Sequence, residues 1–322
     1  MAGYVAGVDL GGTKIYTALA GPGGEIMAEV RVPTGAGDGP DAVIGRILDT
    51  INRVSEMALP AGALLSAVGI GSPGPLDPAS GVVFSSPNLP GWRCVPLRER
   101  LEQSVGAKVF VDNDANLAAL GEYRFGAGRG SSHMVYVTVS TGIGGGLILD
   151  GRLYRGAGGG AGEVGHTVVD PDGPLCGCGR AGCLEALASG TAMAARAREL
   201  VDSGRGAGIL REAGADGEIT AVSVARAAAA GDEEALGIIV RAGRYLGMGL
   251  ANIINIFNPD RLVIGGGALA AGERFWESME AELRARALGP ALENVSVVRA
   301  GLDGRSGLMG AIALALAMAY TE

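Results

Sequence analysis

The sequence predicts an α/β fold built from two related halves, and three observations support it. The chain has 322 residues, 48% of them hydrophobic, enough to bury a substantial core in one large domain or two lobes. A short apolar segment, a glycine-rich turn and a second apolar segment occur in this order twice, at residues 4–20 and 134–149. Strand patterns and helical patterns of apolar residues both occur along the rest of the chain.

The first copy of the repeated unit is a predicted β-hairpin. Its strands, Tyr4–Leu10 and Ile15–Ala20, flank the turn Gly11-Gly12-Thr13-Lys14, against which a phosphate could lie. The second copy begins with the strand Met134–Val139, continues through a turn at 140–146 that contains Thr141, Gly142 and three further glycines, and ends with the strand Leu147–Leu149. Two copies of one phosphate-binding unit indicate two related lobes.

Between and after these units, the spacing of apolar residues predicts further elements. The expected helices span residues 41–57, 115–125, 192–201, 221–229, 232–257 and 307–320, and the expected strands span residues 67–71, 108–111 and 262–265. The segment Gly156–Cys183 contains ten glycines and no regular pattern, and it is longer than an unsupported loop should be. We therefore expect something other than a hydrophobic core to organise it.

Composition and charge exclude several classes of protein. Lys and Arg total 26 against 34 Asp and Glu, a net charge of -8, so we expect neither a nucleic-acid partner nor an anionic membrane partner. The 57 glycines follow no G-x-y period, which excludes collagen. The first ten residues lack the features of a signal peptide, and the apolar stretch 311–320 is too short to span a bilayer. We expect a soluble, cytoplasmic protein.

Asp112-Asn113-Asp114 ends a predicted strand and precedes a predicted helix, the position at which open α/β sheets bind ligands. Phosphoryl transfer needs a carboxylate that accepts the proton of the attacking hydroxyl, together with backbone N–H groups and Mg²⁺ around the phosphates. Because two glycine-rich turns accompany the triplet, Asp114 is our candidate base. The alternative is that any one of the three residues only caps the helix, because Asp and Asn accept backbone N–H bonds there.

A short glycine-rich stretch carries four potential metal ligands. Zn²⁺ takes four nitrogen or sulfur ligands in a tetrahedron, and His166 with Cys176, Cys178 and Cys183 supplies that number. The spacing C-x-C-x4-C differs from that of a zinc finger, and the alternative is that the cysteines are small buried hydrophobic residues. We predict a structural zinc site that organises the glycine-rich segment and positions Glu163 and Glu185.

Taken together and in this order, the motifs resemble the ROK family of sugar kinases and repressors, and most closely its bacterial glucokinase branch. The resemblance is carried by Asp9-Leu10-Gly11-Gly12-Thr13-Lys14, Asp112-Asn113-Asp114-Ala115-Asn116, Thr141-Gly142-Ile143-Gly144-Gly145-Gly146, Glu163-Val164-Gly165-His166 and Cys176-Gly177-Cys178-Gly179-Arg180-Ala181-Gly182-Cys183-Leu184-Glu185. It covers residues 4–318, and the cysteine-rich element with Glu-x-Gly-His is its most specific part.

The resemblance implies a two-lobed actin-like and hexokinase-like (ribonuclease H-like) fold with the active site in an interlobe cleft. Residues 1–117 and 305–322 would form the smaller N-terminal lobe, and residues 118–304 the larger C-terminal lobe with the zinc element. The last helix would fold back onto the N-terminal lobe. Because the family forms dimers and tetramers, we expect a homodimer or a homotetramer.

The resemblance also assigns roles to individual residues. The catalytic base carries over to Asp114, and Asp9 would organise Mg²⁺ through water. Contacts to ATP would come from Gly11, Gly12, Thr13, Lys14, Thr141 and Gly142, and from an adenosine loop at Gly265, Gly266 and Gly267. Sugar contacts would be Asn88, Asn113, Asp114, Glu163, His166 and Glu185, and zinc ligands His166, Cys176, Cys178 and Cys183. His166 would place one ring nitrogen on zinc and the other on the sugar.

The implied activity is that of an ATP-dependent hexose kinase, most simply a glucokinase acting on the 6-hydroxyl of glucose. A kinase for N-acetylmannosamine or N-acetylglucosamine is the alternative, because room for an N-acetyl group depends on loop shape near residues 73–76 and 87–92. A repressor would carry a DNA-binding domain ahead of the first phosphate loop, and only eight residues precede Asp9. A non-catalytic sugar-binding regulator would be expected to lack Asp114. The phosphoryl donor stays open, since relatives can use polyphosphate or ADP.

Overall fold

The computed structural model describes residues 3–214 and 217–319 of the chain. Its strands are β1 (Tyr4–Leu10), β2 (Lys14–Ala20), β3 (Ile26–Pro33), β4 (Leu65–Ser72), β5 (Leu76–Asp77), β6 (Val82–Ser85), β7 (Arg93–Pro96), β8 (Lys108–Asn113), β9 (Met134–Val139), β10 (Ile143–Leu149), β11 (Arg152–Tyr154), β12 (Arg261–Gly265) and β13 (Ser296–Arg299). Its α-helices are α1 (Pro40–Ala58), α2 (Leu97–Val105), α3 (Asp114–Phe125), α4 (Leu184–Ala188), α5 (Gly190–Asp202), α6 (Ala207–Arg211), α7 (Ala221–Ala229), α8 (Glu233–Phe257), α9 (Glu273–Arg286), α10 (Gly289–Asn294) and α11 (Ser306–Ala319). Short 3₁₀ turns occur at η1 (Ala36–Asp38), η2 (Val164–His166) and η3 (Gly267–Ala271).

The chain divides into two compact units. Among the described residues, unit 1 comprises 3–131, 146–162 and 300–319, and unit 2 comprises 132–145, 163–214 and 217–299. The chain therefore passes between the units four times, which makes each unit discontinuous in sequence. Within the described part of the chain, no helix combines the length and the apolar character that a membrane crossing requires.

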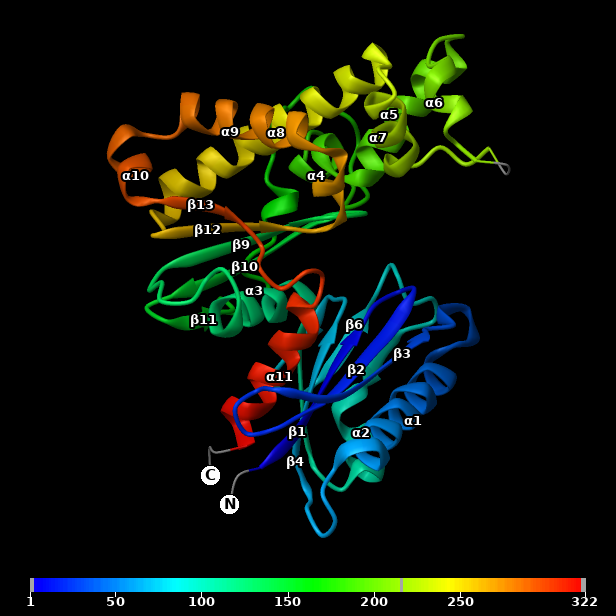
Figure 1. Ribbon diagram of the computed structural model, residues 1–322, viewed down its shortest axis with the longest axis vertical. Helices are drawn as coiled ribbons and strands as arrows, with labels where there is room; N and C mark the ends of the chain where they lie inside the picture. Colours follow the sequence, from blue (N-terminus) through cyan, green and yellow to red (C-terminus); the bar gives the residue numbers. More distant parts are fainter. Residues whose placement is uncertain (1–2, 215–216, 320–322) are drawn as a thin grey trace. The chain divides into compact units, whose positions relative to one another are not determined.

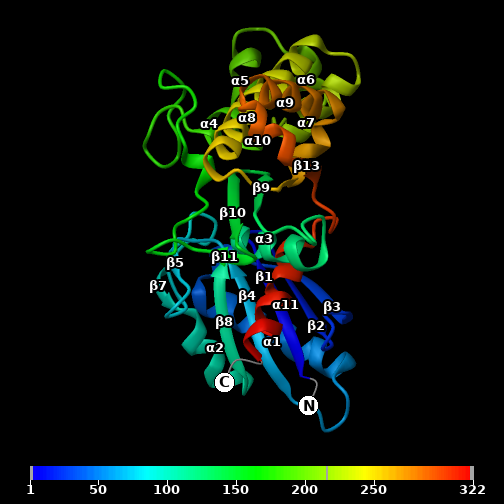
Figure 2. The ribbon, with the colours of Figure 1, turned by 90° about the vertical axis from the view of Figure 1, so that its left-hand side faces the viewer.

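The first sheet lies in unit 1 and has the strand order β3-β2-β1-β4-β8. β1 pairs antiparallel with β2 and parallel with β4, and β4 pairs parallel with β8. The parallel strands are covered on both faces, so they read in the sequence as apolar runs rather than as an alternating pattern. The face of α1 that carries Val43, Ile47 and Ile51 packs on one side of this sheet, and α11 covers the other side (Figures 1 and 2).

The second sheet repeats this strand order as β11-β10-β9-β12-β13. β9 lies between β10 and the parallel strand β12, as β1 lies between β2 and β4, and β13 pairs parallel with β12. The helices α4, α5, α7, α8 and α9 gather on one side of β9 and β12 (Figure 1). The duplication that the sequence predicts is therefore confirmed.

A small third sheet in unit 1, β5-β6-β7, is absent from the sequence-based prediction. Its strands have two, four and four residues, too few for a period-two pattern to be recognised. The segment between β6 and β7 carries Asn88, and α2 begins directly after β7. The third sheet therefore supports the loop of one predicted sugar contact.

Helix α11 packs closely on the rest of unit 1 because glycine occupies the contact points. A Cβ atom on Gly310 would lie 1.6 Å from the carbonyl oxygen of Leu117 in α3, and one on Gly69 of β4 would lie 2.0 Å from that of Ala311. Any larger side chain would push the elements apart. The C-terminal helix thus lies against the N-terminal sheet; Tyr320, its predicted last residue, falls outside the described residues.

Candidate active site

The parallel strands of the first sheet end at a common edge, which brings two acidic residues to the same level. Asp9 of β1 is in register with Gly71 of β4, and Gly71 is in register with Asp112 of β8. Neighbouring strands lie about 4.8 Å apart, so the Cα atoms of Asp9 and Asp112 are about 10 Å apart. Asp114 begins α3 immediately beyond this edge. Open α/β sheets bind their ligands at such an edge.

The turn between β1 and β2 is held in shape by its own backbone and by Thr34. Gly11 donates its N–H to the carbonyl oxygen of Lys14 at 3.0 Å, and the Thr34 hydroxyl donates to that of Gly11 at 2.7 Å. A Cβ atom on Gly12 would lie 2.9 Å from the carbonyl oxygen of Asn88. Glycine at this position therefore lets the loop of Asn88 approach the turn, and the structure brings these two predicted ligand-binding segments together.

Asp9 lies at the end of β1 beside the start of α11. Burial raises the pKa of the Asp9 carboxyl, and the positive charges of Lys14 and Arg31 partly oppose that rise. A Cβ atom on Gly307, the second residue of α11, would lie 3.0 Å from Asp9 Oδ1. Because a helix carries partial positive charge at its N-terminal end, α11 also favours the ionised form of Asp9. No local pattern predicts this contact, because nearly 300 residues separate Asp9 from Gly307 in the sequence.

Asn113 is the N-cap of α3. Its Oδ1 accepts the N–H groups of Ala115 at 2.9 Å and of Asn116 at 3.2 Å, so the capping alternative is correct for this residue. The cap uses only the side-chain oxygen, and the Nδ2 group keeps its capacity to donate to a sugar oxygen. Asp114 is the first residue of α3, half-buried, with Oδ1 accepting the N–H of Ala115 at 2.9 Å.

Asp112, two residues before the candidate base, is buried and hydrogen-bonded through both of its carboxylate oxygens. It is only 1% exposed. Its Oδ1 accepts the N–H of Asn113 at 2.8 Å and the Nδ2 group of Asn116 at 3.1 Å, and its Oδ2 accepts the Nε–H of Arg155 at 2.7 Å. Arg155 escapes prediction, because it lies 43 residues from Asp112 along the chain and no local pattern connects the two.

In unit 2, the turn between β9 and β10 is held by the start of α5 and by a carboxylate. Thr191 donates its N–H to the carbonyl oxygen of Thr141 at 3.2 Å. Oε2 of Glu185 accepts the N–H of Ile143 at 2.9 Å, and a Cβ atom on Gly142 would lie 2.4 Å from the same oxygen. The structure thus brings Thr141, Gly142 and Glu185 together, with one oxygen of Glu185 engaged in holding the turn.

A cavity of about 660 Å³ opens beside this turn. Thr141 and Gly267 both line it, and Gly265 and Gly266 precede Gly267 at the end of β12. Gly266 has a φ of 98° and would place a Cβ atom 2.2 Å from the carbonyl oxygen of Val139, so only glycine fits there. The rest of the lining is not predicted from the sequence and includes Met193, Ala194, Arg198, Ala221, Ala225 and Arg226. This size and mainly apolar lining are typical of small-molecule sites.

The four predicted metal ligands cluster in unit 2. The ligand atoms of His166, Cys176, Cys178 and Cys183 all lie within 4.8 Å of one another. The Sγ atoms of Cys178 and Cys183 are 3.6 Å apart, and Sγ of Cys176 lies 3.7 Å from Nδ1 of His166. Zn–S bonds of about 2.3 Å in a tetrahedron place two sulfur atoms about 3.8 Å apart, so the cluster is compatible with a structural zinc site.

The two ring nitrogens of His166 have different surroundings. Nδ1 faces Cys176, whereas Nε2 lies 3.9 Å from Oε2 of Glu163, too far for a direct hydrogen bond. If Nδ1 binds a metal, the neutral ring carries its proton on Nε2, which then donates on the side of Glu163. Oε1 of Glu185 lies 3.8 Å from Sγ of Cys176, next to the same cluster. Glu163, His166 and Glu185 are therefore grouped around the cysteines.

The predicted residues fall into two sets, one in each unit. Unit 1 contains Asp9, the turn Gly11-Gly12-Thr13-Lys14, Asn88, Asn113 and Asp114. Unit 2 contains Thr141, Gly142, Glu163, His166, the three cysteines, Glu185 and the turn Gly265-Gly266-Gly267. Within each unit, a glycine-rich hairpin turn lies beside polar side chains that can bind hydroxyl groups.

Comparison with known proteins identifies the family. The chain matches the ROK family over residues 5–318. This protein belongs to the ROK family. It is 40% identical over 308 residues to a glucokinase from Thermotoga maritima, with 96% of each chain covered. The crystal structure of a ROK family glucokinase from Streptomyces griseus in complex with glucose and AMPPNP is similar at a TM-score of 0.82 and 37% identity, covering 97% of this chain and 99% of that one.

Other ROK members of similar sequence have different names. An N-acetylmannosamine kinase from Escherichia coli is 37% identical over 308 residues, with 96% of this chain and 97% of the relative covered. A xylose repressor from Caldicellulosiruptor bescii is 34% identical over 314 residues, with 98% of this chain and 78% of the relative covered. The fold is thus the two-lobed α/β fold of the ROK sugar kinases.

Proposed function

We propose that this ROK protein is an ATP-dependent hexose kinase that phosphorylates the 6-hydroxyl of glucose. The observation that carries the proposal is the likeness to glucokinases along nearly the whole chain, together with a carboxylate, Asp114, at the start of α3. A kinase of this type needs a base for the attacking hydroxyl, donors for the phosphates and a polar site for the sugar.

Asp114 acts as the general base in this proposal. It accepts the proton of the sugar hydroxyl as the oxygen of that hydroxyl forms its bond to the γ-phosphorus of ATP, and the bond between that phosphorus and the ADP oxygen breaks. Asn113 orients the sugar through its Nδ2 group while its oxygen caps α3. Placing the hydroxyl within hydrogen-bonding distance of the carboxylate is the main requirement, because phosphoryl transfer depends mostly on positioning and electrostatics.

Five polar side chains bind the sugar hydroxyls in this proposal: Asn88, Asn113, Glu163, His166 and Glu185. The 3.9 Å between Nε2 of His166 and Oε2 of Glu163 lets one sugar hydroxyl accept a hydrogen bond from the imidazole and donate one to the carboxylate. A site with several such pairs rejects sugars that leave its polar groups unmatched.

ATP is bound by the two hairpin turns and by the cavity of unit 2. The turns at Gly11–Lys14 and Thr141–Gly142 offer backbone N–H groups for the phosphates, and the cavity beside Thr141 and Gly267 accommodates the adenosine. Asp9 is the residue that would hold Mg²⁺ through water. Mg²⁺ would neutralise the negative charge of the phosphates that develops during transfer.

A panel of sugars tests the proposed substrate. Glucose, mannose, fructose, N-acetylglucosamine and N-acetylmannosamine are each supplied with ATP, and ADP release is measured. We expect glucose to give the highest kcat/KM. If kcat/KM for an N-acetyl sugar were far above that for glucose, the protein would instead be an N-acetylhexosamine kinase, the alternative that the N-acetylmannosamine kinase relative supports. Binding of sugars without ADP release from any of them would indicate a regulator.

The Cys3His cluster is proposed to hold one structural Zn²⁺. Burial, together with the neighbouring thiols of Cys176 and Cys178, raises the pKa of Cys183 to about 12, so its thiolate is stable only beside a cation. With four protein ligands the metal has no open position, and its role is to organise the glycine-rich segment that carries Glu163 and His166.

Removal of this metal makes the zinc proposal testable. Purified protein should contain about one zinc per chain by mass spectrometry of metals, and Cys176→Ser should lose it together with several degrees of thermal stability. Cys94→Ser is the matched control, because Cys94 is exposed and lies outside the cluster. A demetallated protein with unchanged melting temperature and unchanged sugar binding would contradict the structural role.

The oligomeric state is proposed from the family alone. An assembly of two or four copies is expected, and the mass in solution by light scattering distinguishes these from a single chain.

A further inference from the structure

The buried carboxylate of Asp112 organises the turn from which the candidate base projects. Its Oδ1 is bound to the backbone N–H of Asn113 and to the side chain of Asn116, and both residues also take part in the N-cap of α3. Asp114 lies between them. The orientation of Asp114 at the start of α3 therefore depends on the position of the Asp112 carboxylate.

Arg155 provides the positive charge that this carboxylate needs. Its Nε–H donates a 2.7 Å hydrogen bond to Oδ2 of Asp112. The arginine side chain is 36% exposed, whereas that of Asp112 is 1% exposed, so a partly solvated cation is paired with a buried carboxylate. A buried carboxylate without such a partner is strongly unfavourable.

Arg155 also connects the turn to the third sheet. It begins the loop 155–162, in which Ala161 donates its N–H to the carbonyl oxygen of Arg155 at 3.1 Å. A Cβ atom on Gly159 of this loop would lie 3.3 Å from Pro78, so the loop packs against the end of β5. Arg98 also holds this segment, by donating to the carbonyl oxygens of Pro78 and Ala79. A continuous series of contacts thus joins the region of the third sheet to Asp112.

We propose that Arg155 is a positioning residue for catalysis: through Asp112 it holds the β8–α3 turn so that Asp114 meets the sugar hydroxyl. The inference rests on the proposed role of Asp114 as base. Arg155 touches neither reactant in this proposal, so its removal should reduce turnover by misplacing Asp114 rather than by removing a substrate contact. A small displacement of a catalytic group can lower the rate by about 10²-fold.

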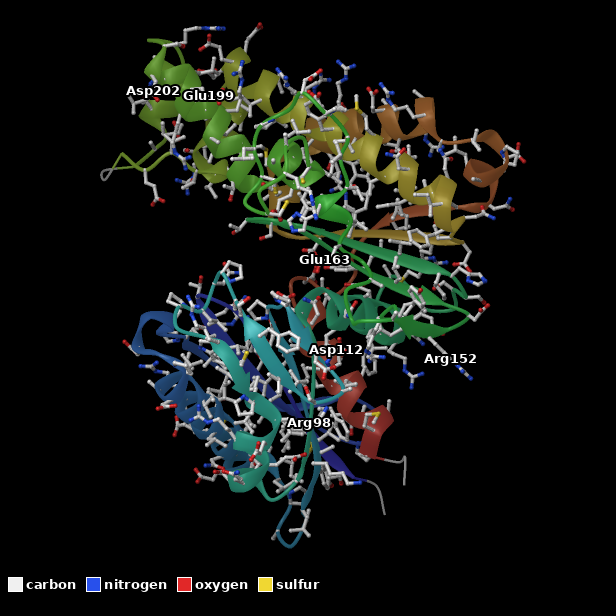
Figure 3. All side chains as sticks on the ribbon, turned by 180° about the vertical axis from the view of Figure 1, so that it is seen from behind. Arg98, Asp112, Arg152, Glu163, Glu199 and Asp202 are labelled. Atoms are coloured by element: carbon white, nitrogen blue, oxygen red, sulfur yellow. The ribbon has the colours of Figure 1, made fainter. Side chains whose placement is uncertain are left out.

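Kinetics of three variants test the proposal. Arg155→Ala should lower kcat on the sugar by about 10²-fold with KM for sugar and for ATP within a few-fold of the parent values. Arg155→Lys, which keeps the charge, should recover part of that loss. Asp112→Asn should resemble Arg155→Ala, and the double variant should be no slower than either single one, because both remove the same interaction. Arg152→Ala is the matched control, since Arg152 lies on β11 apart from Asp112 (Figure 3) and should leave kcat unchanged.

Chemical rescue separates positioning from general damage. Guanidinium chloride at a low, non-denaturing concentration should restore part of kcat in Arg155→Ala but not in Asp112→Asn, with sodium chloride at equal ionic strength as the control. A destabilised fold would be damaged further by guanidinium rather than rescued. Hydrogen exchange gives a readout independent of activity: amides at 113–116 should exchange faster in Arg155→Ala and slow again with guanidinium, whereas amides of β9 and β12 should not change.

The outcomes distinguish this inference from the proposed function. If the parent protein phosphorylates no sugar, the proposed function fails, while the exchange measurement still decides whether Arg155 holds the turn. If the parent is active and Arg155→Ala keeps its kcat, the positioning role is wrong. A loss confined to KM, or a loss that Arg155→Lys and guanidinium both fail to relieve, would overturn it as well.

Discussion

Replacing Asp114 by Asn should lower kcat by about 10³-fold to 10⁴-fold while sugar affinity stays within a few-fold of the parent value. Asparagine has the same shape and can still form hydrogen bonds to a sugar hydroxyl, but it cannot accept the proton that leaves during attack on the phosphorus. The fold should survive, because a charge in the first turn of a helix contributes only about 0.3–1 kcal/mol. Steady-state kinetics and calorimetric titration with sugar measure the two quantities separately.

The matched control for this variant is Asp202→Asn, an exposed carboxylate at the end of α5 (Figure 3). It removes the same charge from the chain, so it shows how much of any loss comes from net charge alone. Turnover of Asp114→Asn close to that of the control would exclude Asp114 as the base. Loss of sugar binding in step with turnover would instead indicate that Asp114 binds the sugar without moving its proton.

The elements that the sequence predicts well are those whose signal is local. The apolar spacing between Val43 and Val54 predicts a helix at 41–57, and α1 spans Pro40–Ala58. The predicted strand, acidic triplet and helix at 108–125 correspond to β8 and α3. Both glycine-rich hairpins are found, but the second turn is shorter than predicted, because β10 begins at Ile143 and includes Gly144, Gly145 and Gly146. The Cys3His cluster also follows from residues close together in the sequence.

The features that escape prediction depend on contacts between distant segments. The strands β5–β7 are too short to show a pattern, and their sheet is defined by pairing rather than by residue type. The bond between Glu185 and Ile143 joins residues 42 positions apart, and the cavity beside Thr141 combines α5, α7 and η3. Sequence patterns predict which face of a helix is apolar, but they do not say which other element meets that face.

Glu122 is such a feature, and its removal should cause the largest loss of stability of any single change considered for this protein. It is fully buried in α3. Its Oε2 accepts the N–H groups of Ala127 at 2.8 Å and Gly301 at 2.9 Å, and its Oε1 accepts the N–H of Leu302 at 3.2 Å and the hydroxyl of Ser306 at 2.6 Å. One carboxylate thus joins the end of α3 to the start of α11, 184 residues away.

Glu122→Ala should destabilise the protein by about 4 kcal/mol. Each hydrogen bond to a charged group contributes about 1.5–3 kcal/mol, and Glu122 accepts four of them, although the individual losses do not add fully. For a chain of this size, 1 kcal/mol corresponds to about 2–4 °C, so the melting temperature should fall by about 10 °C. Scanning calorimetry of the protein without ligands measures the change, and a second scan of the same sample tests whether unfolding is reversible.

Matched variants identify the carboxylate itself as the cause. Glu56→Ala removes an exposed glutamate from α1 and should change the melting temperature by little. Ser306→Ala removes one of the four donors and should cost about 1–2 kcal/mol.

Glu122→Gln keeps the side-chain shape but turns one acceptor into a donor that faces backbone N–H groups. Its loss of stability should therefore lie between the losses of Ser306→Ala and Glu122→Ala. If Glu122→Gln were as stable as the parent, shape rather than hydrogen bonding would account for the burial of this residue.

The segments that Glu122 holds, Gly126–Ala127 and Gly301–Ser306, adjoin two of the positions at which the chain passes between the units. Loosening them should therefore lower turnover as well as stability, since both connections would lose their attachment to α3.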